Sequence, residues 1–493
     1  MTATPDVLDL LGADRSGVAI TDGLRVVTYA ELAPAVRRRA AALAGHGVTP
    51  GDRVVVSVVN SVAAVELYLG CLLLGAVWVG VNPAAPPAER ERLRTLVRPA
   101  LVITDDPDVA TGPGRVVGPS VVLGDNGGQW ARPAPSADLP CAIAFTSGTS
   151  GSPKPVVQTR AGASLTAAAA ATRFRADDRV GLILPLSIHN VMTVGAMAAL
   201  LSGANAVAVA GLNARGVARA CAEHALTMVS ALVPTTIFDL VHDQSIAPAA
   251  LQTLRWAGSG GADLSEGLRA AFEDKFGVGV LGSYGLTEAG GVVCLEEPGS
   301  PHRPGCSGPA LPHARLEIRD QTGLQLGPGQ RGRVQVCPAT DGPWAGLFSP
   351  PRWEWTEDGM RPCPAERCLA TGDYGALDDD GGLYIHGRES GMIVRGGVNV
   401  TAAEVETALA GLDTVREAVV FGEPDERLGE RIVAFVEPTV GAAPDAAVLA
   451  EEARNVLAHS KMPDEFVIVA HLPRNALGKV VRAQLPSRRP TRG

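Results

Sequence analysis

The regular alternation of short apolar runs with longer stretches rich in Ala, Leu and Arg most constrains the fold of this chain. The apolar runs have the length of buried strands and lie at 53–59, 101–104, 180–186, 206–210, 228–233 and 278–284. Helix candidates stand between them at 62–76, 161–172 and 213–224. Because parallel strands need a crossover connection, usually a helix, this rhythm predicts an α/β domain with parallel or mixed sheets covered by helices.

The sequence pattern changes near residue 310, where short segments of alternating apolar and polar residues are separated by glycine turns. These segments are RLEIRD (315–320), GRVQVCP (332–338) and GLYIHGR (382–388). Alternation of apolar and polar residues indicates half-buried strands in an antiparallel arrangement. We therefore expect a β-barrel-like subdomain, or a small antiparallel sheet, within the large domain.

A second break falls at GRESGMIVRGG (387–397), which suggests a hinge near Gly391. The helix that follows is predicted to begin after Thr401, with Thr401 as its N-cap and Glu404 as the capping-box partner. A small α+β module follows, with strand candidates at 415–423 and 431–438 and a helix candidate at 446–460.

At 493 residues the chain is too long for a single core. The predicted units are a large N-terminal domain at 1–390 and a small, mobile C-terminal domain at 391–493. The hydrophobic share of 46% and the charged share of 19% are typical of a well-buried globular protein. The net charge of −9 argues against a broad nucleic-acid surface and against anchoring on anionic lipid.

The sequence predicts neither export nor membrane insertion. Residues 1–11 lack the positive leader and long apolar core of a signal peptide, and the longest apolar run, 67–81, is too short to span a bilayer. The eight cysteines are scattered without a CxxC pair, so we expect reduced, mostly buried thiols and no metal framework. These features favour a soluble cytoplasmic protein without a membrane anchor.

Lysine is rare in this chain, which draws attention to the four that remain. Of the 43 basic residues, only Lys154, Lys275, Lys461 and Lys479 are lysines. An ammonium is a compact point charge and a guanidinium a broad planar fork, so a retained lysine indicates a position that arginine does not fill. Lys154 ends a loop rich in glycine and hydroxyl residues, TSGTSGSPKP (146–155), which is either a surface linker or an anion-binding loop.

Five short stretches in a fixed order decide between these two interpretations. They are TSGTSGSPKP (146–155), GSGGADL (258–264), SYGLTEAGG (283–291), TGD (371–373) followed by GR (387–388), and ALGKVVR (476–482). This set resembles the adenylate-forming superfamily, and most closely its AMP-forming acyl-CoA synthetases, over essentially the whole chain. The resemblance implies that ATP and a carboxylate give acyl-AMP and pyrophosphate, after which the small domain rotates and a thiol takes the acyl group.

In this superfamily the glycine loop wraps the β- and γ-phosphates of ATP. The loop is not a Walker A motif, because no GK[ST] ends it. The resemblance implies a positive charge from Lys154 and hydroxyl and N–H groups from Thr146, Ser147, Gly148, Thr149, Ser150 and Gly151.

The resemblance also assigns the other nucleotide contacts. Tyr284 offers a ring for adenine stacking, Thr287 a hydroxyl for the α-phosphate, and Glu288 a hard carboxylate suited to Mg²⁺. Asp373 is implied to accept both ribose hydroxyls, with Arg388 reinforcing that side. The remaining implied contacts are Gly261, Ala262, Ser283 and Gly285.

Three further residues are assigned by resemblance to acyl transfer. Lys479 resembles the mobile-domain lysine that bridges the substrate carboxylate and the α-phosphate, where its charge stabilises the transition state. His189 resembles the residue that gates the acyl pocket; the alternative is a histidine at a helix N-terminus that faces solvent. Gly397 resembles part of the loop that lines the pantetheine tunnel. Coenzyme A and a carrier protein acting in trans both present pantetheine, so the thiol acceptor stays open.

The predicted substrate is a small-molecule carboxylic acid without an amine. Relatives that activate amino acids carry an aspartate near the segment that matches 184–195, and here residues 187–190 contain no acid. Small residues near the predicted acyl channel suggest room for a bulky aryl, fatty or polycyclic group; they are Gly260, Gly261, Gly290 and Gly291.

Two positions depart from the family pattern. Gly391 stands where the hinge usually carries Asp or Lys, and Pro155 stands where glycine usually follows the loop lysine. We expect a complete acyl-CoA ligase. The alternatives are an enzyme that only transfers preformed acyl-AMP to CoA, a ligase that loads a carrier protein in trans, and an acyl-adenylate binder without ligase activity.

Overall fold

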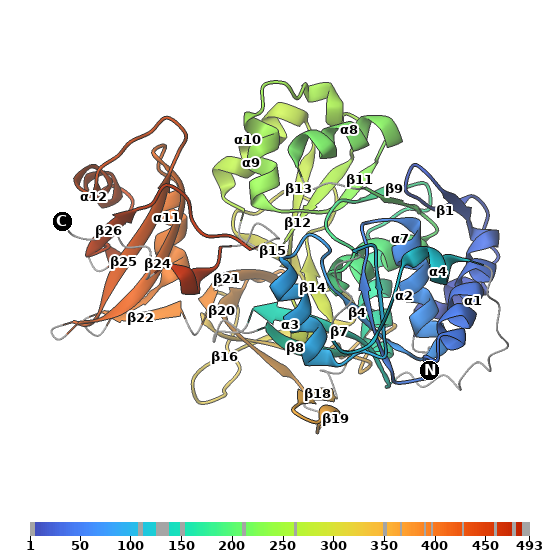
Figure 1. The fold of residues 1–493 in the computed structure, drawn as a ribbon. Helices are drawn as coiled ribbons and strands as arrows, with labels where there is room; N and C mark the ends of the chain where they lie inside the picture. The colour runs from blue at the N-terminus through green and yellow to red at the C-terminus, as the bar shows by residue number, and fades with distance from the viewer. Residues whose placement is uncertain are drawn as a thin grey trace.

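The computed structural model of the chain shows a large body and a smaller one, and residues beyond 391 form the smaller body at the left of Figure 1. The structure describes residues 5–106, 112–124, 138–147, 153–209, 213–260, 264–348, 353–364, 367–388, 391–395, 398–425, 428–457, 461–475 and 480–485.

An eight-stranded mixed sheet forms the centre of the large body. Its strand order is β14 (Gly291–Leu295), β13 (Gly279–Leu286), β12 (Trp256–Ser259), β11 (Met228–Leu232), β9 (Arg179–Leu182), β10 (Asn205–Ala208), β1 (Val18–Thr21) and β2 (Val26–Thr28). The edge strands β2 and β14 run antiparallel to their neighbours, and the others pair in parallel. Both faces are apolar, as expected for parallel strands buried on two sides.

Helices cover both faces of this sheet. One face packs under α8 (Ala214–His224), α9 (Pro234–His242) and α10 (Glu266–Phe276), which lie together at the top of Figure 1. The 3-10 turn η3 (Pro248–Leu251) joins the same core. The other face packs against α5 (Arg160–Ala171) and α7 (Ala198–Ser202).

A six-stranded sheet completes the α/β part. Its order is β6 (Arg115–Val117), β5 (Leu101–Thr104), β3 (Arg53–Ser57), β4 (Val77–Gly80), β7 (Pro140–Ser147) and β8 (Pro153–Thr159), and its strands pair in parallel apart from β7 and β8. One face shares a core with η1 (Val7–Leu11), α1 (Tyr29–Gly45), α2 (Val62–Leu74) and α4 (Pro119–Leu123). The other face packs under α3 (Pro87–Val97) and the hairpin of β18 (Trp353–Thr356) and β19 (Gly359–Pro362).

A five-stranded antiparallel sheet follows in the chain. Its order is β15 (Cys306–Pro309), β21 (Gly382–Arg388), β20 (Leu369–Leu377), β17 (Gly332–Pro338) and β16 (Ala314–Arg319). The strands β15 and β16 form its two edges, so this part of the chain is an open sheet, the second of the two forms expected from the glycine-punctuated segments.

The smaller body is an α+β unit. Its sheet has the order β23 (Val398–Thr401), β22 (Met392–Arg395), β25 (Gly429–Pro438) and β24 (Val415–Asp425), with β26 (Glu465–Ile468) beside β25. The helices α11 (Ala402–Ala410) and α12 (Ala446–Arg454) share its apolar core, and the short turn η7 (Arg482–Gln484) follows. The predicted fold class is confirmed. The boundary between residues 390 and 391 stays a prediction, because residues 389 and 390 lie outside the described ranges.

Two local expectations in the sequence were wrong. Thr401 is the N-cap of α11 as expected, but its side chain makes no capping bond, and the Glu404 carboxylate expected to complete a capping box forms an ion pair with Lys461. The expectation that the cysteines are all reduced also fails, since Cys337 and Cys368 form a disulfide with a Cα–Cα distance of 4.2 Å. These two cysteines are 31 residues apart in the sequence, and the pairing of β17 with β20 brings them together.

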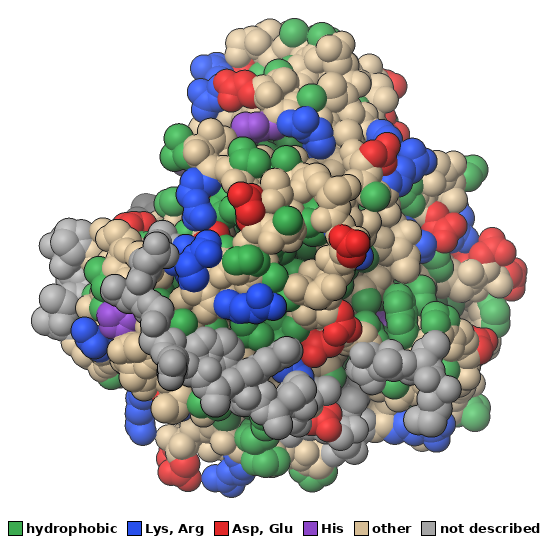
Figure 2. All heavy atoms as spheres, turned by 90° about the vertical axis from the view of Figure 1, so that its right-hand side faces the viewer, with side chains coloured by type: hydrophobic (Ala, Val, Ile, Leu, Met, Phe, Trp, Pro, Cys, Tyr) green, Lys and Arg blue, Asp and Glu red, His purple; other side chains and the backbone are tan. Residues whose placement is uncertain are grey.

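None of the described helices is both long and apolar enough to cross a bilayer. On the described part of the face shown in Figure 2, acidic, basic and apolar side chains are interspersed. That face therefore lacks the single-sign patch that nucleic acid or anionic lipid would favour.

Lys275 has a structural role that explains why a lysine stands there. Its Nζ donates to the carbonyl oxygens of Leu240, Val241 and Asp243 at 2.8, 2.9 and 3.0 Å. These carbonyls lie at the C-terminal end of α9, where helix carbonyls lack partners within the helix. One ammonium with three donors satisfies all of them.

We expect Lys275→Ala to lower the free energy of unfolding by about 2 kcal/mol, because three carbonyl oxygens lose a charged donor. Lys275→Arg should recover only part of this, since a planar guanidinium does not direct three donors from one nitrogen. Thermal unfolding followed by circular dichroism measures both. The control is Lys461→Ala, which removes a partly exposed ion pair and should cost about 0.5 kcal/mol. Equal shifts in melting temperature for the two alanine variants would contradict this role.

Candidate active site

The glycine loop connects the two strands of a hairpin. In the pair β7–β8, Thr146 lies opposite Lys154 and Ser147 lies opposite Pro153, and residues 148–152 lie outside the described ranges. Lys154 is exposed, and within the described ranges no carboxylate pairs with its ammonium. Pro155 lies on β8, the edge strand of its sheet, where proline is tolerated because one side of an edge strand needs no ladder partner. The hairpin therefore presents a free positive charge at the start of β8.

The SYGLTE stretch runs from β13 into the short turn η4 (Thr287–Ala289). Gln158 on β8 donates its Nε2 to the carbonyl oxygen of Thr287 at 2.7 Å. This bond joins the base of the hairpin to η4, so the hydroxyl of Thr287 and the carboxylate of Glu288 lie beside the strands that carry the glycine loop.

Asp373 lies on a bulge of β20. Arg333 pairs with Tyr374 and Gln335 with Ala370, so residues 371–373 stand opposite Val334 alone. Gly372 has φ +72°, a left-handed conformation that favours glycine. Thr371 closes the bulge, because its Oγ1 donates to the carbonyl of Val334 at 2.9 Å and accepts from the N–H of Asp373 at 3.0 Å. A bulge of this kind redirects a side chain out of the ladder.

Two donors hold the Asp373 carboxylate, which is 5% exposed. Tyr284 donates its hydroxyl to Oδ2 at 2.6 Å, and Nε of Arg388 forms an ion pair with Oδ1 at 3.0 Å. Burial, together with the neighbouring Asp373 charge, raises the pKa of Tyr284 well above its usual value, so the phenol remains a donor. Each carboxylate oxygen has a second lone pair, so Asp373 can accept further hydroxyls.

Glu288 fits a divalent cation by the chemistry around it. The side chain is partly buried on η4, and among the described residues no lysine or arginine pairs with its carboxylate. A carboxylate without a protein cation is a suitable ligand for Mg²⁺, which takes one or two protein oxygens and retains several waters.

His189 is buried, so the solvent-facing alternative was wrong. It is the first residue of α6 (His189–Val191), it is 3% exposed, and its Nε2 lies 3.3 Å from the hydroxyl of Tyr68. The ring also approaches Trp78, at 6.2 Å between centroids. Burial lowers the pKa of His189 to about 4, so the imidazole is neutral near pH 7. A π-helical turn, η2 (Met192–Met197), follows α6 directly, and such turns occur often at functional sites.

Of the glycines expected to leave room for the acyl group, Gly260, Gly290 and Gly291 lie close to neighbouring side chains, and Gly261 lies outside the described ranges. A Cβ at Gly260 would lie 2.5 Å from Oγ of Ser283, and one at Gly291 would lie 2.4 Å from Oδ1 of Asn190. Gly290 and Gly291 also have φ of +83° and +132°. At these described positions glycine allows a left-handed backbone or close packing, and the acyl channel stays a prediction.

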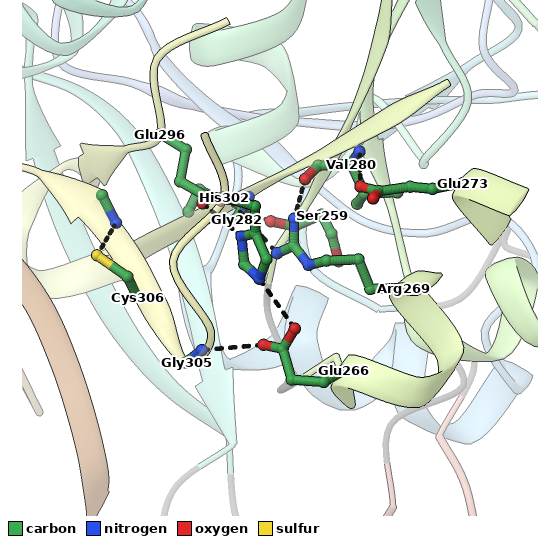
Figure 3. Close-up of polar contacts among 12 residues, drawn as sticks. Ser259, Glu266, Arg269, Glu273, Val280, Gly282, Glu296, His302, Gly305 and Cys306 are labelled. Carbon is green, nitrogen blue, oxygen red and sulfur yellow. Dashed lines mark hydrogen bonds and ion pairs between the residues drawn. The ribbon is translucent and has the colours of Figure 1, made fainter. Parts of the chain in front are cut away.

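A polar network that the sequence did not predict supports the backbone before Tyr284 (Figure 3). Glu296 accepts from the N–H of Gly282 and from Nη2 of Arg269, and Arg269 donates to the carbonyl of Val280. Nδ1 of His302 lies 2.8 Å from Oε1 of Glu296, and its Nε2 lies 2.9 Å from Oε2 of Glu266, both at hydrogen-bond distance.

The network joins three parts of the fold, which are α10, β13 and the segment after β14. Its residues are up to 36 positions apart, so no local pattern could have revealed it. On β13 itself, Ser283 donates its hydroxyl to the carbonyl of Ser259 on the neighbouring strand β12 at 2.9 Å. The strand that presents Tyr284 is thus held from both sides.

Several predicted site residues lie outside the described ranges. They are Gly148, Thr149, Ser150, Gly151, Gly261, Ala262, Gly397 and Lys479, together with the side chain of Ser147. The structure brings Tyr284, Asp373 and Arg388 into direct contact. Thr287 and Glu288 follow Tyr284 on η4, which Gln158 joins to the strand that carries Lys154, and Thr146, Ser283 and Gly285 lie on β7 and β13.

Comparisons with known proteins agree with this geometry. The models of the AMP-binding enzyme family and of its C-terminal domain match residues 13–337 and 404–479. The chain is 30% identical to sulfoacetate–CoA ligase of Cupriavidus necator, over 98% of each chain. It is 31% identical to the fatty acid–[acyl-carrier-protein] ligase ScoC of Streptomyces coeruleorubidus, over 94% of this chain and 92% of that one.

Among solved structures, ATP-bound MatB from Rhodopseudomonas palustris has a TM-score of 0.84 at 26% identity, and its apo form has a TM-score of 0.75 at 27% identity. Each comparison covers 99% of both chains. The chain therefore belongs to the AMP-binding enzyme family, the adenylate-forming superfamily, and is an AMP-forming acid–thiol ligase.

Proposed function

We propose that this ligase activates a carboxylic acid without an amine as acyl-AMP and transfers the acyl group to the thiol of CoA. The observation that carries the proposal is the Asp373 carboxylate, held between Tyr284 and Arg388 and aimed by a bulge. A cytoplasmic location, as expected from the sequence, belongs to the same proposal.

Asp373 is the proposed ribose ligand. Its oxygens accept two hydroxyls while the contacts with Arg388 and Tyr284 hold the carboxylate in a fixed orientation. The ring of Tyr284 offers an aromatic face to adenine, while its hydroxyl stays on Asp373. One residue thus links base recognition to ribose recognition.

Lys154, Thr146 and Thr287 are the proposed phosphate ligands. The free ammonium of Lys154 supplies the charge, and the hydroxyls of the two threonines donate hydrogen bonds. Mg²⁺, held by Glu288, would neutralise charge on the phosphate oxygens when bound. The joined hairpin and η4 give these groups one rigid support.

The acyl group is proposed to enter beside α6. Among the described residues from Ser187 to Asn190 there is no carboxylate for a substrate amine, and His189 is neutral, so this segment offers no charge partner for an ammonium. The enclosing side chains of Tyr68 and Trp78 make the surroundings of His189 aromatic. We infer an uncharged acyl body rather than an amino acid.

The second half-reaction is proposed to need rotation about Gly391. In the arrangement described here Gly391 does not have a left-handed φ, and among the described residues a Cβ would meet only the Cβ of Ala402, at 3.9 Å. This arrangement therefore does not require glycine, and we infer that its conformational freedom is used in another orientation of the small domain. The higher TM-score to the ATP-bound form of MatB than to its apo form supports the present arrangement as the nucleotide-bound one.

A carrier protein is the second candidate for the acceptor, favoured by the similarity to an acyl-carrier-protein ligase. An enzyme limited to the transfer half-reaction is less well supported. Pro155 lies on an edge strand that tolerates it, and Lys154 beside it remains unpaired among the described side chains. Neither departure from the family pattern removes a described group that adenylation needs.

Pyrophosphate release with a panel of carboxylic acids, with CoA, with a carrier protein or with neither acceptor, tests the proposal. We expect acid-dependent pyrophosphate release and an acyl-CoA product identified by mass spectrometry. Release followed by acyl transfer only to a carrier protein would move the assignment to the second candidate. Activity from synthetic acyl-AMP alone would leave the transfer half-reaction.

Asp373→Asn is expected to raise the KM for ATP about tenfold, because a neutral amide loses the charge-assisted bonds to the ribose hydroxyls and to Arg388. The change should leave KM for the acid nearly unaltered. Steady-state pyrophosphate release measures both constants, with Asp320→Asn, in a remote surface turn, as the matched control. An unchanged KM for ATP would remove Asp373 from the site.

Lys479→Ala is expected to slow acid-dependent pyrophosphate release about 100-fold or more. The reason is that the transition state loses the lysine cation that stabilises negative charge on the α-phosphate. Transfer from synthetic acyl-AMP to CoA should continue at near the parental rate, since that step no longer involves the carboxylate and the triphosphate. A variant that adenylates as fast as the parent would refute the assigned role. Lys461→Ala, in the same small domain, controls for the loss of a lysine.

A further inference from the structure

The disulfide lies at one end of the bulge that presents Asp373. Val336 pairs with Leu369, and the next residues outward, Cys337 and Cys368, carry the bond. Cys337 is fully buried and Cys368 is partly buried. The bulge begins three positions after Cys368, at Thr371, so the covalent link and the nucleotide carboxylate share one short segment of β20.

The bulge weakens the ladder where Asp373 stands. On its C-terminal side β20 continues through several paired residues and the neighbouring strand β21. On its N-terminal side only Ala370 and Leu369 pair with β17 before the disulfide. Two ladder pairs at the end of a strand fray readily, so the disulfide is the strongest constraint on that side.

A metal site is the competing interpretation of this cluster. The carboxylate of Glu317 lies within 4.8 Å of both sulfurs, and two thiolates with one carboxylate suit a thiophilic cation after reduction. However, Arg315 engages Oε1 of Glu317 and Arg319 engages its Oε2. Two guanidinium groups occupy the only carboxylate and repel a cation, so the geometry favours the disulfide.

We propose that the Cys337–Cys368 disulfide is a positioning element for Asp373, and that its reduction by a dithiol lowers the affinity of the enzyme for ATP. This inference rests on the proposed nucleotide role of Asp373. In the oxidised protein both ends of the bulge are anchored, so the carboxylate is preorganised for the ribose. In the reduced protein the N-terminal end of β20 must be ordered when the nucleotide binds.

The redox step balances with an external dithiol. One thiolate of the reductant attacks Sγ of the more accessible Cys368, the Cys337–Cys368 bond breaks, and Cys337 leaves as a thiolate that takes a proton. The second thiol of the reductant then displaces Cys368 and forms the oxidised dithiol, which leaves Cys368 as a thiol. Two electrons and two protons pass from reductant to protein, and an oxidised dithiol reverses the step.

Because the ribose contacts are the same in the ground state and the transition state, loss of preorganisation weakens binding without slowing chemistry. We expect the KM for ATP to rise about fivefold on reduction, with kcat changed by less than about twofold. A general loss of folding would instead lower kcat and the amount of active enzyme together.

The test compares the full chain in air-oxidised form and after treatment with dithiothreitol, with thiols alkylated and the cross-linked peptide identified by mass spectrometry. Cys337→Ser/Cys368→Ser should show the high KM in both conditions, and Cys363→Ser, which alters a cysteine outside this disulfide, should respond like the parent. Direct ATP binding by calorimetry gives the same comparison without turnover. If the double variant does not fold, reduced parent protein supplies the result.

Absence of the cross-linked peptide in oxidised protein, or equal ATP affinity in the two states, overturns the proposal. A stoichiometric Zn²⁺ ion retained by the reduced protein and lost in Glu317→Gln would also overturn it in favour of the metal site. Failure of the ligase function is distinguishable, because it abolishes pyrophosphate release in both redox states while the ATP-binding comparison remains measurable.

Discussion

The nucleotide site depends on the placement of one almost fully buried carboxylate. A carboxylate with little access to water needs donors, and Asp373 obtains them from Tyr284 on β13 and from Arg388 on β21. Three strands from two different sheets therefore meet at a single side chain. Their relative position follows from these bonds, and the hairpin that carries Lys154 is tied to the same place through Gln158 and η4.

The residues that support the site are held by contacts as specific as those of the site residues themselves. The backbone of β13 just before Tyr284 is held by Glu296 and Arg269, and the loop beyond β14 is drawn onto α10 by His302. These bonds are made by residues that no motif contains. They hold the aromatic ring and the carboxylate of the site in place, although they contact neither a ligand nor a reacting group. A rigid scaffold positions the loops that act on a substrate in the same way.

Much of the fold was readable because secondary structure depends on local periodicity. The apolar runs at 53–59, 101–104 and 228–233 became β3, β5 and β11, and the predicted helix at 213–224 became α8. The order of the five motifs likewise predicted the family. The same local reading failed where a partner came from far away, as for Glu404, whose capping role was replaced by Lys461, and for His189, which distant aromatic residues enclose.

The sequence by itself determined the alternation of strands and helices, the division into a large and a small unit, and the chemical types available at the nucleotide site. Those properties depend on neighbours along the chain. Three contacts were decided only by the tertiary structure. Cys337 forms a disulfide with Cys368, the side chain of Asn190 packs against Gly291, and Tyr284 donates a hydrogen bond to Asp373, 89 positions away in the sequence. Such contacts depend on strand register and close packing. Both are set by the whole molecule, so they leave no pattern in the local sequence.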